Sequence, residues 1–457
     1  MLGERGAVFV SMSLGSHWAH NTEAHPIAGD TTTWSPDVMI PVTSSLLAAT
    51  PLELVVRDQH GQSRDPFGHA VVACDQFTCQ PNVWVTVTGD AVNKGGSVTG
   101  QFSLKAKYRP SCYPKFDDRN KSLMRQALTV GLFDQLKDRR TPGGVDLLRN
   151  IRCGVDSPSS EVGVTAGDEA SYETFRELFD PVLEAYHGVD LSEGDYNVSN
   201  QDSSELDRMD QIVYEYVVSS HVESVRNVKG YALAPAISDS ERVALESALK
   251  NCLGEMKSEF SGEYYSLGDM TGEERNRLES LGLLLTAPPA GSYLDHAGIS
   301  NDWPRGRGVF SNGSNEFAVH VNGPDHLRVL CQNQGGDIGA VFEDWISANN
   351  GLEHCLSSHG MTMQKSDRLG YITTSPADVG SGLRAGMVLR LPCLGKDEAA
   401  LHGMCSKLGL RVARHPVLDN CWEVFNVVTL GKTEVEIVQQ IIDGVSAITQ
   451  QESDKLN

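Results

Sequence analysis

The apolar residues in the first hundred positions recur with a period of two. Val8, Val10, Met12 and Leu14 alternate with other residues, and residues 52–57 repeat the pattern. A period of two indicates strands, because successive side chains of a strand point to opposite faces. Further short strands are expected at Ala70–Cys74, Val83–Val87 and Phe102–Tyr108, with Gly and Asn between them. The pattern predicts an antiparallel β-sandwich over residues 1–108.

The period then changes to that of a helix. Within Ser171–His187 the apolar residues fall three or four positions apart, on one face, and residues 123–136 show a similar stripe. We therefore expect a small all-α domain at 109–190.

An acidic stretch follows the predicted helices. Residues 189–223 hold nine Asp/Glu and one Arg, with few apolar residues before Ile212. This composition predicts a solvated linker at 191–211 that acts as a hinge or docking segment.

The rest of the chain mixes helices and strands. Helices are predicted at Glu241–Leu253 and Thr271–Leu281. The last helix should begin at Thr433, because Glu436 lies at capping-box spacing from it. We place this α/β domain at 212–450 and a tail at 451–457. Strands are expected at Phe317–Val321, Arg328–Cys331, Gly370–Thr374 and Val388–Leu391.

Composition narrows the function. The 457 residues carry a formal charge of −22, which opposes nucleic-acid binding. No run reaches the roughly 18 apolar residues of a membrane span, so a membrane partner is not expected. The cysteines are scattered without a C-x-x-C pair, so we predict no metal site and a reducing, cytoplasmic location.

Several short segments, in order along the chain, match one family. Residues 113–116 read Tyr-Pro-Lys-Phe, residues 325–328 Asp-His-Leu-Arg and residues 367–370 Asp-Arg-Leu-Gly. From Tyr113 onward the chain resembles the phosphagen kinases, arginine kinase in particular. The resemblance implies a small all-α domain followed by an α/β domain with a large antiparallel sheet. With the β-sandwich, the predicted fold class is multidomain α+β.

The first hundred residues resemble a C-two domain, the calcium- and lipid-binding sandwich. Asp58 and Asp65 match one of its calcium loops, but His60 stands where an aspartate is usual. Calcium needs several converging carboxylate oxygens, so a calcium-free sandwich is expected. A calcium-responsive membrane adaptor is the alternative interpretation.

The kinase resemblance implies a cage of arginines around the ATP phosphates, two glutamates that orient the guanidinium group, and a cysteine beside it. In this chain His221 and Glu223 stand at two arginine positions. Pro324 replaces the first glutamate and Ser375 the cysteine, and the segment with the second glutamate is shorter. Arg328 and Arg384 remain as phosphate-cage arginines.

These replacements predict a large loss of activity. Losing one such arginine can cost about 10³–10⁵ in rate, and losing an acid–base group about 10²–10⁴. We therefore predict a pseudoenzyme without a cofactor. It would serve as a scaffold in a cytoskeletal assembly of a cilium or flagellum axoneme, with tubulin or axonemal proteins as partners. The alternative is an active ATP:guanidino phosphotransferase that uses Mg-ATP through a rearranged site.

Overall fold

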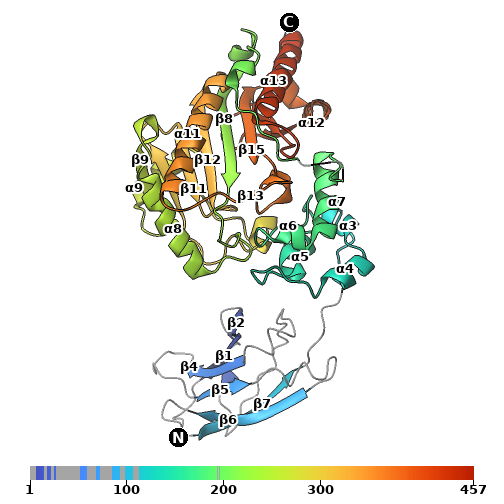
Figure 1. Cartoon of the computed structure of the whole chain (residues 1–457), viewed down its shortest axis with the longest axis vertical. Coiled ribbons are helices and arrows are strands. Elements are labelled where there is room, and N and C mark those ends of the chain that lie inside the picture. Colours follow the sequence, from blue (N-terminus) through green and yellow to red (C-terminus); the bar gives the residue numbers. More distant parts are fainter. Residues whose placement is uncertain are drawn as a thin grey trace. The chain divides into compact units, whose positions relative to one another are not determined.

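The computed structural model describes residues 113–456, except 193 and 195, and the strands between residues 7 and 106. The chain divides into two compact units, Met1–Tyr113 and Pro114–Asn457 (Figure 1). Each unit is described by itself below.

The described strands of the first unit form one antiparallel sheet in the order β2-β1-β4-β5-β6-β7, and β3 also pairs with β1. They overlap the strands expected from the alternating pattern. A two-layer sandwich and the C-two likeness stay predictions, and His60 and Asp65 lie outside the described residues. The strands are β1 (Ala7–Leu14), β2 (Trp18–Asn21), β3 (His25–Pro26), β4 (Leu52–Asp58), β5 (Gly68–Val72), β6 (Val85–Val92) and β7 (Val98–Ala106).

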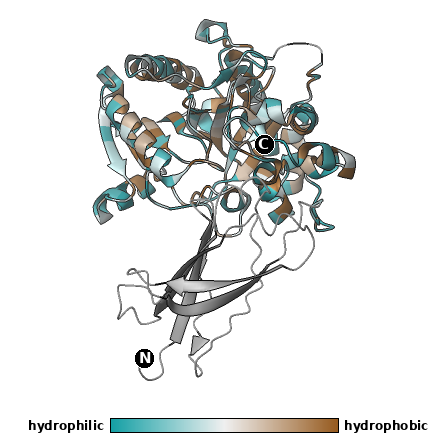
Figure 2. Cartoon of the chain, turned by 60° about the horizontal axis from the view of Figure 1, so that its bottom comes forward, coloured by the Kyte–Doolittle hydropathy of each residue, from teal (hydrophilic) through white to brown (hydrophobic). Residues whose placement is uncertain are grey.

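The second unit begins with short helices, as the helical period predicted. Ser122, Thr129 and Asp146 cap α3, α4 and α5, each accepting a backbone N–H with its side chain. Most residues of the apolar stripes are buried, Leu178, Phe179 and Val182 among them. Figure 2 colours the hydrophobic residues of the chain brown. The helices are α3 (Leu123–Ala127), α4 (Val130–Leu136), α5 (Leu147–Asp156), α6 (Ser171–Thr174) and α7 (Arg176–His187).

A contact between two glycines joins α5 to the loop at 160–165. A Cβ on Gly154 would lie 2.1 Å from the carbonyl oxygen of Gly163. Gly163 has a φ of +80°, and its own Cβ would lie 2.5 Å from Ser122 Oγ. Both positions therefore require glycine if helix and loop are to approach so closely.

We expect Gly154→Ala to destabilise the protein by about 1–3 kcal/mol, because the added methyl group overpacks a backbone contact. Thermal melting of the full chain would measure this. Gly131→Ala is the matched control, since Gly131 lies in α4 with open space around it. That change should stabilise the protein by about 0.5–1 kcal/mol. Equal melting temperatures for the two variants would contradict the prediction.

An eight-stranded antiparallel sheet forms the centre of the second unit, in the order β16-β17-β15-β8-β12-β11-β10-β9. Helices α8, α11 and α13 pack on one face of it, around buried side chains such as Trp345 and Phe342. The strands are β8 (Val217–Arg226), β9 (Gly262–Ser266), β10 (Gly308–Asn312), β11 (Phe317–Val321), β12 (Leu327–Gln334), β15 (Leu383–Arg390), β16 (Leu410–Arg414) and β17 (Cys421–Asn426).

The helices of this part agree with the predicted ones, and the capping box at Thr433 and Glu436 is formed. The last helix reaches Leu456, past the position where a tail was expected, and its Glu452 is buried. Among the described residues, none of the helices combines the length and apolarity needed to cross a membrane. The helices are α8 (Asp239–Leu253), α9 (Gly272–Ser280), α10 (Tyr293–His296), α11 (Ile338–Ser358), α12 (Glu398–Lys407) and α13 (Glu434–Leu456).

The acidic stretch is bound to the sheet domain along its length. Ser199 and Asn200 donate hydrogen bonds to the Glu434 carboxylate, at 3.0 Å each to Oε2. Leu206 and Ile212 pack against the main core. These contacts show a strap across the surface where composition predicted a solvated hinge.

Candidate active site

The two faces of β8 have different roles. Ser224 accepts a hydrogen bond from the indole of Trp345 at 3.1 Å, so this side chain faces the core beneath α11. Because side chains alternate along a strand, His221 and Glu223 face the other way. Their predicted companions Arg328 and Arg384 come from β12 and β15, the two strands that pair with β8. The register thus brings four of the six predicted site residues together.

The charged side chains on this face form two ion pairs. Arg328 Nε donates to Glu223 Oε2 at 2.8 Å, and Arg384 donates to Glu423 of β17 at 2.7 Å. Arg384 also lies 4.0 Å from Glu223, and His221 lies 3.3 Å from Glu423. Each arginine therefore has a carboxylate partner.

Burial and neighbouring charges have opposite effects on the pKa values of the two carboxylates in these pairs. Burial raises the pKa of Glu223, but Arg328 and Arg384 outweigh it and hold that pKa below its usual value. Burial likewise raises the pKa of Glu423, whereas the hydrogen bond from His221 and the charge of Arg384 lower it to about 2. Both carboxylates are thus ionised at neutral pH, and the two arginines keep about 40% of their side-chain surface exposed.

The other two predicted residues lie in neighbouring turns. Pro324 is in the turn between β11 and β12, and Ser375 caps the 3₁₀ turn η4 (Pro376–Asp378) by accepting from the Ala377 N–H. The turns are joined, because the carboxylate of Asp325 accepts a hydrogen bond from the Thr374 N–H at 2.7 Å. In the described residues no hydrogen bond links Pro324 or Ser375 to the charged cluster.

The helical part holds η4 in place. The Tyr172 hydroxyl donates to the Thr373 carbonyl, and His187 Nε2 lies 2.9 Å from the Pro376 carbonyl. On the other side, Thr429 donates to the Ala377 carbonyl at 3.2 Å. The turn that carries Ser375 is therefore fixed between α7 and the sheet domain.

The shortened segment forms a hairpin of β16 and β17. Arg414 is exposed and lies 3.9 Å from Glu398 on α12. Arg411 reaches the helical part, where it pairs with Glu161 at 2.5 Å. The hairpin thus contributes to the site mainly through Glu423.

Two acidic residues near this site were not singled out from the sequence. Glu423 becomes visible only when β17 is placed next to β15, because its partner Arg384 is distant in sequence. Asp378 was detectable as a carboxylate three residues after Ser375, but its surroundings depend on packing.

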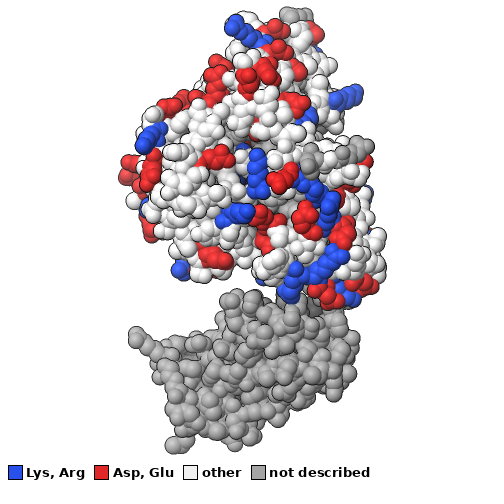
Figure 3. Space-filling model, viewed as in Figure 1, with Lys and Arg blue, Asp and Glu red and all other residues white. Residues whose placement is uncertain are grey.

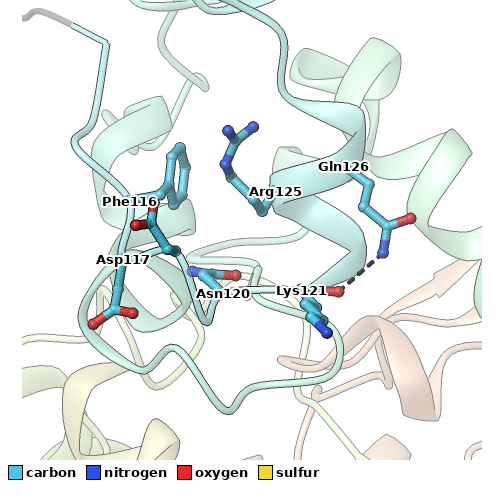
Figure 4. A pocket seen from close by; sticks show the side chains of 7 residues that line it. Phe116, Asp117, Asn120, Lys121, Arg125 and Gln126 are labelled. Atoms are coloured by element: carbon cyan, nitrogen blue, oxygen red, sulfur yellow. Dashed lines mark hydrogen bonds between the residues drawn. The ribbon is translucent and has the colours of Figure 1, made fainter.

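A surface cavity of about 490 Å³ lies elsewhere, between residues 116–121 and α3 (Figure 4). Phe116, Lys121 and Arg125 are among its lining residues, and no predicted site residue is. Acidic and basic side chains are interspersed over the visible face of the second unit (Figure 3). The described residues include no group of three or more His, Cys, Asp or Glu side chains arranged to hold a metal.

Comparisons with known proteins give a consistent result. A family profile described as the ATP:guanido phosphotransferase C-terminal catalytic domain matches residues 244–455, and that for the N-terminal domain matches residues 118–184. Creatine kinase B-type of Gallus gallus is 35% identical over 362 residues, covering 76% of this chain and 93% of that protein. Human creatine kinase M-type is 34% identical over the same length.

Solved structures agree with this result. A lombricine kinase superposes with a TM-score of 0.70 at 28% identity, over 75% of this chain and 95% of that one. The duplicated taurocyamine kinase of Schistosoma mansoni reaches 0.68 at 29% identity, over 74% of this chain and 47% of that one. The predicted helical domain and large antiparallel sheet are confirmed.

The prediction of a pseudoenzyme is wrong by these comparisons. Proteins that share a third of their residues with this chain, over nearly their whole length, are kinases. The prediction weighed the replacements at 221, 223, 324 and 375 together with the shortened segment. It took no account of charged groups that other segments bring to the same face, such as Glu423.

Proposed function

Because the chain belongs to the ATP:guanido phosphotransferase family, we propose that it transfers a phosphoryl group between ATP and a guanidino nitrogen through a rearranged site. The observation that carries the proposal is the similarity to creatine kinases over 93% of their length, which includes both domains of the family. ATP would enter as its magnesium complex. Creatine, lombricine and taurocyamine, named in the relatives, are the first acceptors to test, together with arginine and glycocyamine.

The two arginines are the groups that would bind the phosphates. They lie on the strands either side of β8 and face the same side of the sheet. A phosphate oxygen can replace a carboxylate oxygen as hydrogen-bond acceptor without leaving the guanidinium unpaired. Each such charge-assisted bond contributes about 1.5–3 kcal/mol. Binding of ATP would thus exchange the partners Glu223 and Glu423 for phosphate oxygens.

A coupled assay of ADP release with each acceptor tests this function. We expect turnover above background with at least one acceptor, and a loss of about 10³-fold or more on Arg384→Met. Arg390→Met is the matched control, because Arg390 lies exposed on the same strand and should leave the rate unchanged. Background rates with every acceptor would refute the proposal.

The predicted partners, tubulin or axonemal proteins, and the predicted cilium or flagellum location stay predictions. A location in a cilium or flagellum is compatible with the proposed kinase activity, because the location does not change the reaction. Co-sedimentation of the full chain with microtubules tests the prediction of tubulin as a partner. A chain that stays in the supernatant at all microtubule concentrations would contradict that prediction.

A further inference from the structure

The guanidinium group of Arg384 lies over an aromatic ring as well as beside its carboxylate partner. Its Cζ is 3.8 Å from the centroid of the Phe425 ring. Phe425 follows Glu423 by two residues on β17, so both side chains leave the strand on the same face, while Val424 between them is buried. A guanidinium group this close to a ring face is attracted by the ring's quadrupole. One strand thus gives Arg384 two neighbours, a ring and a carboxylate.

The register of the sheet explains why the ring stands beside Arg384. Phe425 pairs with Gly386, which follows Arg384 by two residues on β15 and therefore lies on the same face. Gly386 also pairs with His221 of β8, and a Cβ on the glycine would lie only 2.7 Å from the His221 ring. The position without a side chain thus lets rings from both neighbouring strands stand close to β15.

The next arginine on this face has a ring of its own. Arg411 of β16 stands opposite Phe425 in the register. Its guanidinium group, however, pairs with Glu161 and lies 5.7 Å from the centroid of the Tyr186 ring. The contact between Phe425 and Arg384 is therefore not shared with the neighbouring cation.

The hydrogen bonds of Arg384 leave its side chain only partly fixed. Nη2 donates to Glu423 at 2.7 Å, whereas Nε is buried and, among the described residues, has no hydrogen-bond partner. The Glu223 carboxylate lies 4.0 Å from Nε, beyond hydrogen-bonding distance. Glu423 itself is shared with His221, which lies 3.3 Å away. With a single shared acceptor, the orientation of Arg384 depends on the ring as well.

We propose that Phe425 is a positioning residue, whose ring keeps the Arg384 guanidinium group in place while this group exchanges Glu423 for a phosphate oxygen of ATP. The inference rests on the proposed function. The carboxylate is given up when the phosphate arrives, but the ring contact is kept, because it occupies the face of the guanidinium group and not its N–H groups. A side chain that is already held loses less freedom on binding, which strengthens the binding of the ligand.

Titration calorimetry with Mg-ATP and Mg-ADP, combined with the coupled assay, tests this role. Phe425→Leu should weaken the binding of both nucleotides by about 2–30-fold, the range for the loss of a cation–π contact. The KM for the acceptor should stay unchanged. Phe425→Tyr keeps the ring and should bind as the wild type does. Tyr214→Leu is the matched control, since Tyr214 is an exposed aromatic residue of η2 (Val213–Glu215), and it should leave both quantities unchanged.

Two further measurements show whether Phe425 acts through Arg384. Arg384→Met removes the cation, so adding Phe425→Leu to that variant should weaken nucleotide binding no further. In NMR spectra of arginine-labelled protein, the side-chain signal of Arg384 is identified by its loss in Arg384→Met. The ring current of Phe425 should shift this signal in the wild type and in Phe425→Tyr, and the shift should vanish in Phe425→Leu.

The outcomes separate this inference from the proposed function. Nucleotide binding that weakens in Phe425→Leu, without turnover of any acceptor, would support the positioning role and refute the kinase. Turnover with unchanged nucleotide affinity in Phe425→Leu, an equal further loss in the Arg384→Met background, or an Arg384 signal without a ring-current shift would each overturn the role and leave the kinase standing. Absence of nucleotide binding by the folded wild type would overturn both, and thermal melting verifies that each variant is folded.

Discussion

Replacing His221 and Glu223 together by arginine should raise kcat/KM for phosphoryl transfer by about 10³-fold or more. Both side chains leave β8 on the face that carries Arg328 and Arg384, so the variant would gather four guanidinium groups there. The transferred phosphoryl group spreads negative charge over its oxygens, and fixed cations stabilise that charge in the transition state. The coupled assay with the preferred acceptor measures the change.

The same variant should melt at a lower temperature without nucleotide. Four cations would then face one another, and Arg328 would lose its partner Glu223. Mg-ATP should restore the melting temperature, because a ligand that binds only the folded state stabilises it by mass action. A variant without this rescue would show that phosphate does not bind on this face.

Two single variants distinguish the possible causes of a higher kcat/KM in the double variant. Glu223→Gln removes the negative charge without adding a cation, so we expect tighter ATP binding with a smaller gain in rate. Asp443→Arg changes the overall charge far from the sheet face and should alter neither quantity. If Asp443→Arg raised the rate as much as the double variant, long-range attraction of ATP would explain the gain and the proposed arginine positions would be wrong.

The sequence predicted the parts of this molecule that local periodicity determines. The stripe within Ser171–His187 predicted α7, and the short, mostly apolar run at Phe317–Val321 predicted β11 with the same bounds. Each of these patterns depends only on neighbours a few positions away. The resemblance to the phosphagen kinases then supplied the arrangement of the large sheet, which periodicity alone does not fix.

The site was predicted less completely, because its charge balance depends on contacts between distant segments. The pairing of Arg384 with Glu423 follows from the register of β15 and β17, and that of Arg411 with Glu161 joins residues 250 positions apart. Counting replaced residues one by one pointed to His221 and Glu223, which the register of β8 places on one face. It could not show which carboxylates would stand near them. The prediction of a pseudoenzyme is overturned by the similarity to creatine and lombricine kinases, which a count of replaced residues does not weigh.

The second large effect that we expect is a loss of folding stability when the pH is lowered. Burial lowers the pKa of His187, His320 and His326 to about 4, so all three are neutral in the folded protein. His326 shows why: its Nδ1 accepts the Val228 N–H at 3.0 Å, and its Nε2 lies 2.9 Å from the Ala232 carbonyl. A proton on Nδ1 would break the first bond and place a charge in the core.

The direction of this pH dependence follows from which state, folded or unfolded, binds more protons. In the unfolded chain a histidine binds its proton near pH 6.5, whereas in the folded protein it does so only near pH 4. Between these values the unfolded state holds more protons, so the free energy of unfolding falls as pH falls. Each histidine contributes a loss of about 3 kcal/mol, complete once the pH is below its folded pKa.

Asp378 has the opposite effect on the pH dependence of folding stability. Its pKa of about 7 lies above the unfolded value of 3.8, so the folded state takes up that proton first and gains stability from pH 7 downward. Wild-type stability should therefore fall by less than the sum of the three histidines. Asp378→Asn should be more sensitive to acid between about pH 6.5 and about pH 4.5, because this opposing contribution is gone.

Urea unfolding of the wild type, His326→Gln and Asp378→Asn across this range measures both contributions. The glutamine variant should flatten the pH dependence, since a neutral amide replaces a group that charges only on unfolding. Their effects on the slope should be opposite in sign. If both variants changed the slope of stability against pH in the same direction, the pKa of His326 or of Asp378 in the folded protein would not be shifted as its burial implies.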